Sequence, residues 1–154
     1  MKKSNFFYLS LFILLFSSSL NCFSQNNYFK QYKRISDSLS LVYKIPSCVI
    51  LSVAYIESGG GTSLNSKKLN NHFGIVGNCQ YQISKHKSKY RYYPSIDASY
   101  IGFCELVKSK KFYSSMINNT DEELWLKKIA ATGYAADANK WSNTIYNIIK
   151  SKCK

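Results

Sequence analysis

The feature that most constrains this chain is an apolar segment over residues 47–58 that runs directly into three consecutive glycines at 59–61. Drawn as a helix, the segment is apolar on nearly every side, which is typical of a helix buried at the centre of a domain. Glycine has no Cβ and readily takes the left-handed conformation that ends a helix. The sequence therefore predicts a central buried helix, with Pro46 at its start, where the fixed φ of proline suits the first turn.

One carboxylate, Glu57, lies on the last turn of this predicted helix and shares a face with Ile50, Val53 and Ala54. Burial among aliphatic groups and the negative end of the helix dipole both disfavour a charged carboxylate, so both raise its pKa. An acid that stays protonated near neutral pH can protonate a leaving group, and this predicts a catalytic acid. The alternative is a glutamate on the exposed edge of the helix, solvated through the opening that the glycines create.

Residues 1–24 have the pattern of a secretory signal peptide. Two lysines precede an apolar run from Phe6 to Phe16, and small residues precede a predicted cleavage after Ser24. The run is shorter than the roughly 20 residues that span a bilayer, so we expect no stable membrane insertion after cleavage. Cys22 leaves an acylated lipoprotein as the alternative. The prediction is export to the periplasm or the extracellular space.

The mature chain has 19 basic and 8 acidic residues, a net charge of +11. This charge favours a polyanionic partner, and outside the cytoplasm the plentiful polyanions are wall and surface polymers, so we expect no nucleic-acid partner. The cysteine spacing matches no zinc site, and only His72 and His86 offer imidazoles, so we expect no metal and no cofactor. Three disulfide pairings are open to the four mature cysteines, which are Cys48, Cys79, Cys104 and Cys153. With 154 residues in all, we expect a single domain and a monomer.

Helical periodicity recurs along most of the chain. It predicts an amphipathic helix over residues 27–43, a short helix capped by Thr62 or Ser63, and a helix opened by Pro94 and Ser95. A capping box from Thr120 to Glu123 begins another helix that Gly133 ends. A last helix follows the Gly-Tyr-Ala-Ala-Asp loop at 133–137. The expected buried positions are Phe29, Tyr32, Ile35, Leu39 and Val42 in the helix over residues 27–43, Tyr100, Phe103, Cys104 and Val107 in the helix after Ser95, and Trp141, Ile145, Ile148 and Ile149 in the last helix.

Between residues 73 and 93 the helical periodicity stops. Tyr81 and Ile83 alternate with polar residues, and residues 90–93 are rich in strand formers, so the sequence predicts a small antiparallel hairpin. Its tyrosines, Tyr93 among them, either pack on the core or offer flat faces to sugar rings.

Four blocks of the sequence carry a family resemblance. They are Ala-Tyr-Ile-Glu-Ser-Gly-Gly-Gly-Thr-Ser at 54–63, Asn-Asn-His-Phe-Gly-Ile-Val-Gly at 70–77, Tyr-Arg-Tyr-Tyr-Pro-Ser at 90–95, and Gly-Tyr-Ala-Ala-Asp at 133–137. In the same order, they resemble the glucosaminidase domain of bacterial peptidoglycan hydrolases, the family of flagellar muramidase-type proteins and many autolysins. The resemblance divides the chain into a signal peptide (1–24), an N-terminal helix (25–45) and a glucosaminidase-like catalytic domain (46–154).

The resemblance implies an α+β, mainly helical, lysozyme-like fold, with a groove between a helical lobe and a small β-hairpin lobe. It also implies cleavage of β-1,4 bonds in peptidoglycan glycan strands after N-acetylglucosamine. Glu57 matches the general acid and Tyr134 matches an active-site tyrosine. Asn71 and Phe73 match the turn that shapes the groove, where Asn71 either contacts the glycan or holds the turn. Tyr93 and Asp137 are further candidates for substrate binding.

The chain departs from the family at the second carboxylate, which members usually carry in the hairpin. No acidic residue lies between Glu57 and Asp97. Either Asp97 or Asp137 could replace it, or activity could be weakened or lost. The options ranked first are the 2-acetamido group of the substrate as nucleophile and a water molecule held by Tyr134. The leading hypothesis is a peptidoglycan hydrolase with Glu57 as general acid. The rivals are a lytic transglycosylase that uses Glu57 as sole acid and base, and a catalytically silent wall-binding module.

Overall fold

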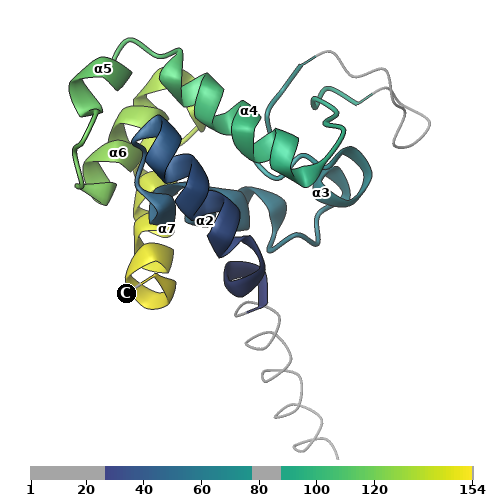
Figure 1. Cartoon of the computed structure of the whole chain (residues 1–154). Helices are drawn as coiled ribbons and strands as arrows, with labels where there is room; N and C mark the ends of the chain where they lie inside the picture. Colours follow the sequence, from purple (N-terminus) through teal and green to yellow (C-terminus); the bar gives the residue numbers. More distant parts are fainter. Residues whose placement is uncertain (1–26, 78–87, 154) are drawn as a thin grey trace, which may run out of the picture.

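The computed structural model describes residues 27–77 and 88–153, and this part of the chain is mainly helical (Figure 1). The signal peptide predicted for residues 1–24 lies outside the described residues. In chain order, the elements are a helix over residues 27–43, α2 (Ser47–Ser58), α3 (Leu64–Leu69), α4 (Ile96–Lys108), α5 (Tyr113–Met116), α6 (Glu122–Ile129), the π-helical segment η1 (Ala130–Tyr134) and α7 (Ala138–Lys152).

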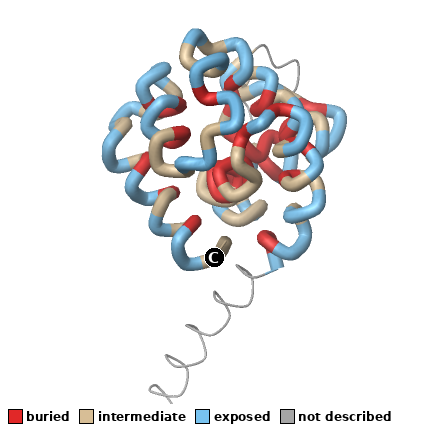
Figure 2. Tube along the Cα trace, turned by 60° about the vertical axis from the view of Figure 1, so that its left-hand side comes forward, coloured by how far each residue is buried: buried red, intermediate tan, exposed pale blue. Residues whose placement is uncertain are grey.

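Helix α2 is the centre of the molecule, as its all-round apolar sequence predicts. Val49, Ile50, Val53 and Ala54 are fully buried, and the helix packs against α4, α6 and α7. Figure 2 shows the buried positions gathered inside a shell of exposed ones. Gly59 ends the helix with φ at 58°, and the next two glycines also have positive φ. The chain therefore turns sharply just after Glu57.

The helix over residues 27–43 packs on the core through Tyr28, Phe29, Leu39 and Tyr43. The prediction that Val42 faces inward is wrong, because Val42 is 69% exposed. In a helix Tyr43 follows Leu39 by four residues, so it lies on the inner face that Val42 leaves. The start of α2 is tied to this helix, since the Ser47 hydroxyl donates to Asp37 Oδ1 at 2.6 Å.

The helix starts follow local capping rules, with one correction. Ser63 and Ser95 cap α3 and α4, as predicted, by accepting hydrogen bonds from backbone N–H groups. Helix α6, however, is capped by Asp121 and not by the predicted Thr120. The Asp121 carboxylate accepts from Leu124 N–H at 2.9 Å, so the helix begins one residue later than the capping box indicated.

The hairpin region is only partly described. An isolated antiparallel bridge joins Val76 and Tyr90, and Arg91 N–H donates to the Ile75 carbonyl at 2.9 Å. Tyr81 and Ile83 lie outside the described residues. Within the described ranges, the pairing consists of this single bridge and does not extend into strands. The small β-lobe is therefore less developed there than the sequence predicted.

A disulfide between Cys48 and Cys153 joins the start of α2 to the end of α7, with Cα atoms 5.9 Å apart. Cys104 is a buried free thiol, and Cys79 lies outside the described residues. Within the described ranges, none of the helices combines the length and apolar character that crossing a membrane requires.

Candidate active site

Glu57 lies on the last turn of α2, half-buried, and faces the first turn of α7. The indole N–H of Trp141 donates a hydrogen bond to Glu57 Oε1 at 2.6 Å. The carboxyl group extends from α2 and is bonded by a side chain of α7, which restricts its rotation. The fold therefore presents Glu57 in one orientation.

Burial raises the pKa of Glu57 above its ordinary value, and the hydrogen bond from Trp141 opposes this rise. Desolvation penalises the charged carboxylate, whereas an N–H donor favours it, and here desolvation is the larger effect. The direction agrees with the sequence argument. A carboxyl group in this environment keeps its proton to a higher pH than a solvated glutamate.

The turn over residues 71–75 lines the site beside Glu57, and the side chain of Asn71 holds this turn. The Asn71 side chain donates to the carbonyls of Ile75 and Arg91 at 2.9 and 2.8 Å and accepts from the N–H groups of Phe73 and Ile75 at 3.3 and 3.1 Å. The side chain is fully buried, so these contacts describe a structural role. The alternative that Asn71 contacts a glycan stays a prediction.

Gly74 brings this turn against the carboxyl group. Its φ is 62°, which favours glycine, and a Cβ at this position would lie 3.2 Å from Glu57 Oε2. Glycine therefore allows the backbone to approach the acid without displacing it.

Phe73 and Tyr134 join the turn to η1. The Phe73 ring is buried and stacks on Phe103 with ring centroids 4.4 Å apart, while its carbonyl accepts a hydrogen bond from the Tyr134 hydroxyl at 2.6 Å. Burial is the main cause that raises the pKa of Tyr134 well above that of an ordinary tyrosine, and the negative charge of Glu57 adds to it. The phenol thus stays protonated and braces the turn beside Glu57.

Glu57 and Trp141, which the hydrogen bond joins, line two different pockets. The first has a volume of about 250 Å³ and is lined by Glu57, Phe73, Gly74, Ile75, Val76, Leu106, Lys110, Thr132, Gly133 and Tyr134. The second, of about 320 Å³, is lined by Ile56, Ala135, Ala136, Asp137, Lys140, Trp141 and Thr144.

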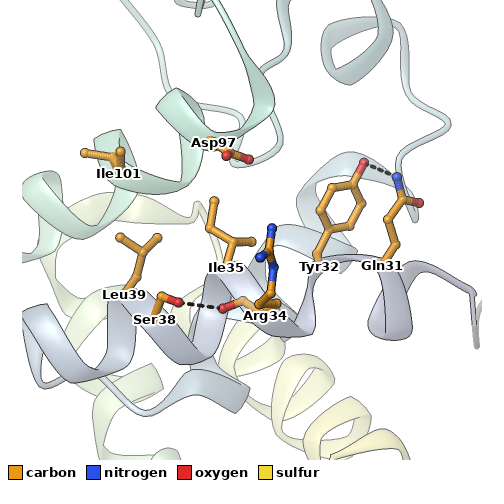
Figure 3. A pocket seen from close by; sticks show the side chains of 8 residues that line it. All are labelled: Gln31, Tyr32, Arg34, Ile35, Ser38, Leu39, Asp97 and Ile101. Carbon is orange, nitrogen blue, oxygen red and sulfur yellow. Dashed lines mark hydrogen bonds between the residues drawn. The ribbon is translucent and has the colours of Figure 1, made fainter.

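Glu57 is the one carboxylate that lines the first pocket, and all eight acidic residues of the sequence fall within the described ranges. Asp97 instead lines a separate pocket of about 500 Å³ between the helix over residues 27–43 and α4 (Figure 3). Asp137 caps α7 by accepting from Lys140 N–H at 2.9 Å, and it lines the second pocket. The structure thus brings Asp137 near the site and places Asp97 in a different pocket.

Tyr93 is placed in the core and not in either pocket. It is only 6% exposed, and its ring packs so closely on α4 that a Cβ at Gly102 would lie 2.7 Å from it. Of the two roles considered for the hairpin tyrosines, core packing is the one that these contacts describe.

A metal site has few candidate ligands here. Within residues 27–77 and 88–153, no three His, Cys, Asp or Glu side chains gather as a metal ion would require. His72 is buried, its Nδ1 lies 2.7 Å from the Tyr28 hydroxyl, and burial lowers its pKa to about 4. His86 lies outside the described residues.

Sequence reasoning missed two residues of this site. Trp141 was expected only to pack, and it is separated from Glu57 by 84 residues along the chain. Lys110 follows the end of α4, where one lysine of several gave no signal. Neither role follows from local spacing, because both depend on how α4 and α7 pack around α2.

Comparisons with known proteins identify the family and the fold. The glucosaminidase family model, described as mannosyl-glycoprotein endo-beta-N-acetylglucosaminidase, matches residues 33–154. Among solved structures, the chain is similar to a C-terminally truncated glycoside hydrolase domain from Salmonella typhimurium FlgJ, with 19% identity, a TM-score of 0.64, and coverage of 83% of this chain and 98% of that one.

Two further structures share the fold. The catalytic domain of the autolysin Auto from Listeria monocytogenes is 21% identical, with a TM-score of 0.65 and 84% of each chain covered. A peptidoglycan hydrolase from Sphingomonas sp. A1 is 19% identical, with a TM-score of 0.65 and coverage of 83% of this chain and 92% of that one. No curated protein sequence matches. Because the family model matches most of its length, this chain belongs to the glucosaminidase family of glycoside hydrolases.

Proposed function

We propose that this protein is an exported peptidoglycan hydrolase that cleaves β-1,4 bonds of the glycan strand, with Glu57 as general acid. The observation that carries the proposal is a single half-buried carboxyl group with a raised pKa, oriented by an indole donor and lining a pocket. Peptidoglycan as the substrate is supported by the similar solved structures, which include an autolysin and a peptidoglycan hydrolase.

The two carboxyl oxygens of Glu57 have different surroundings. Oε1 accepts from Trp141, so Oε2, which faces Gly74, is the oxygen that carries the proton. In the proposed reaction this proton passes to the glycosidic oxygen as the bond to the anomeric carbon breaks. Glu57 is then ionised, and the hydrogen bond from Trp141 stabilises that form.

The partner that attacks the anomeric carbon is the remaining question, since Glu57 is the one carboxylate of its pocket. Tyr134 cannot serve as the base, because its raised pKa keeps the phenol protonated and its hydroxyl already donates to the Phe73 carbonyl. We therefore propose that the 2-acetamido oxygen of the substrate attacks and forms a cyclic oxazolinium. Water then opens this ring after giving a proton to Glu57, which restores the acid and leaves a reducing N-acetylglucosamine end.

The second candidate is a lytic transglycosylase, which the same single carboxylate favours. Glu57 would protonate the glycosidic oxygen and then accept a proton from a hydroxyl of the same sugar, whose attack leaves an anhydro end and no new reducing end. Hydrolysis keeps the lead because the matched family is described by glucosaminidase activity.

Digestion of purified sacculi separates these reactions. The mature protein, Glu57→Gln and Glu105→Gln are each incubated with sacculi, and the released fragments are identified by mass. Glu105 is an exposed glutamate that accepts from the Tyr43 hydroxyl at 2.6 Å, so it is a matched control outside both pockets. Reducing N-acetylglucosamine ends that disappear only in Glu57→Gln are the expected result.

Other outcomes decide against the proposal. Anhydro ends would establish the transglycosylase, and intact sacculi with retained binding would establish the silent wall-binding module. If Glu57→Gln digests sacculi as fast as the parent protein, Glu57 is not the general acid. Asp97→Asn and Asp137→Asn test the replacement carboxylates, since substrate assistance requires neither. It also requires retention at the anomeric carbon, observed by NMR, whereas an enzyme that activates water directly inverts.

We propose that residues 1–24 are a signal peptide that directs export and is cleaved after Ser24. The mature chain is then a monomer, with an N-terminal helix (25–45) followed by a catalytic domain (46–154). The disulfide between Cys48 and Cys153 supports an oxidising compartment. Mass analysis of protein recovered from the periplasm or medium tests this, with Gln25 as the expected first residue. Retention of residues 1–24 in the recovered protein would contradict it.

A further inference from the structure

Among the residues that the structure describes, Lys110 is the basic residue that lines the pocket containing Glu57. Its side chain is half-buried, whereas its neighbours Lys108 and Lys111 are exposed. A positive charge at the edge of a partly enclosed pocket interacts with a bound anion more strongly than a fully solvated lysine does. Lys110 therefore differs from the many surface lysines of this basic chain.

The backbone fixes the position from which this side chain starts. Lys110 N–H donates to the Val107 carbonyl at 3.0 Å, and the Lys110 carbonyl accepts from Tyr113 N–H at 3.0 Å. These bonds hold the turn between α4 and α5. The flexible part of Lys110 is thus its side chain, which lines the pocket together with Leu106.

Within residues 27–77 and 88–153, Lys110 is in neither of the ion pairs Lys33–Asp37 and Lys127–Glu123. Glu57 does not serve as its partner either. Burial and the Trp141 hydrogen bond account for the pKa of Glu57, whereas an ammonium close to the carboxyl group would lower that pKa as a further cause. The charge of Lys110 is therefore available to a ligand in the pocket.

We infer that Lys110 binds a carboxylate of the substrate and so selects peptidoglycan over neutral N-acetylglucosamine polymers. The inference rests on the proposed function and adds a specificity determinant to the same pocket. Peptidoglycan offers carboxylates in two places: the lactyl group of muramic acid where the peptide is absent, and the stem peptide where it is present. Both present the same chemistry to an ammonium group, which binds either through charge-assisted hydrogen bonds.

The test compares Lys110→Met with Lys111→Met. Both remove one positive charge and keep an unbranched side chain, but Lys111 is exposed and lies outside the pocket. Each substitution is made in the active protein and in Glu57→Gln, so that kcat/KM and Kd are measured independently. The three ligands are peptide-free glycan strands, peptide-bearing strands and neutral chito-oligosaccharides of similar length.

Lys110→Met should weaken binding and lower kcat/KM roughly tenfold for carboxylate-bearing strands, with no change for chito-oligosaccharides. Lys111→Met should change neither, and added salt should narrow the difference between parent and Lys110→Met. A loss confined to peptide-free strands assigns the lactyl carboxylate, and a loss confined to peptide-bearing strands assigns the stem peptide.

Two results would overturn the inference: equal affinity of Lys110→Met and the parent for every ligand, or an equal loss on neutral oligosaccharides. The proposed function fails differently, because then the parent protein cleaves no strand, leaves anhydro ends, or is matched in digestion by Glu57→Gln. The Kd values of the Glu57→Gln series still decide the role of Lys110 in that case.

Discussion

The hydrogen bond from Trp141 to Glu57 predicts how the pH dependence of activity responds to one substitution. The indole N–H lies 2.6 Å from Oε1 and lowers the pKa of Glu57 against the larger effect of burial. Trp141→Phe removes the donor and keeps an aromatic ring beside Tyr134. The pKa of Glu57 should therefore rise further.

The size of this rise follows from the strength of the bond. A hydrogen bond to a charged group contributes about 1.5 to 3 kcal/mol, and one pKa unit corresponds to about 1.36 kcal/mol. The full loss would raise the pKa by about one to two units. Because Glu57 is only half-buried, water can replace part of the lost bond, so we expect a rise of about one unit.

The assay is kcat/KM against pH for a soluble glycan, over about pH 4 to 9. Activity requires protonated Glu57, so it declines at high pH as Glu57 ionises, and this decline should move about one unit higher in Trp141→Phe. Trp125→Phe is the control, because it removes an indole N–H that donates to the Asn119 carbonyl at 2.8 Å, away from both pockets. It should lower stability without moving the profile.

The reasoning is refuted if the decline of kcat/KM at high pH stays at the same pH or moves to a lower pH in Trp141→Phe while circular dichroism shows an intact fold. The group that limits activity at high pH would then be something other than Glu57, or the indole would not stabilise its ionised form.

Three further predictions concern stability. Burial raises the pKa of Glu57 in the folded protein above its value in the unfolded chain, so the fold loses stability as pH rises through the folded pKa and Glu57 ionises. Glu57→Gln should therefore have a higher Tm than the parent at neutral pH, and the difference in Tm should narrow toward about pH 4. A difference in Tm that does not depend on pH would contradict this. Asn71→Ala removes the four hydrogen bonds of a fully buried side chain and should cost about 3 kcal/mol in urea unfolding; a loss under about 1 kcal/mol would not fit. Replacing Cys48 and Cys153 by serine should cost about 2 to 4 kcal/mol, since the bridge closes a span of 105 residues, and should abolish the effect of reductant on the unfolding midpoint.

Local sequence signals predicted the helices well because they act within a few residues. The bounds of α2, the glycine termination after it and the serine caps of α3 and α4 all follow from backbone conformation and nearby hydrogen bonds. The errors were of the same local size: Asp121 caps α6 one residue after Thr120, and Tyr43 takes the inward place expected for Val42.

The catalytic candidate was also visible in the sequence, because an acid on an apolar helix face must be buried or lie at a cleft. What the sequence could not supply was its surroundings. The absence of a carboxylate between residues 57 and 97 is a sequence fact, yet only the structure shows Asp97 lining another pocket and Asp137 capping α7.

By itself, then, the sequence determined the central helix, its end at the glycines and the placement of Glu57 on its last turn, since these depend on propensities within one segment. The tertiary structure decided that Trp141 orients the carboxyl group, that Cys48 pairs with Cys153, and that Lys110 lines the pocket. These contacts join residues far apart in the chain. Their geometry depends on how all the helices pack around α2, and no local pattern encodes it.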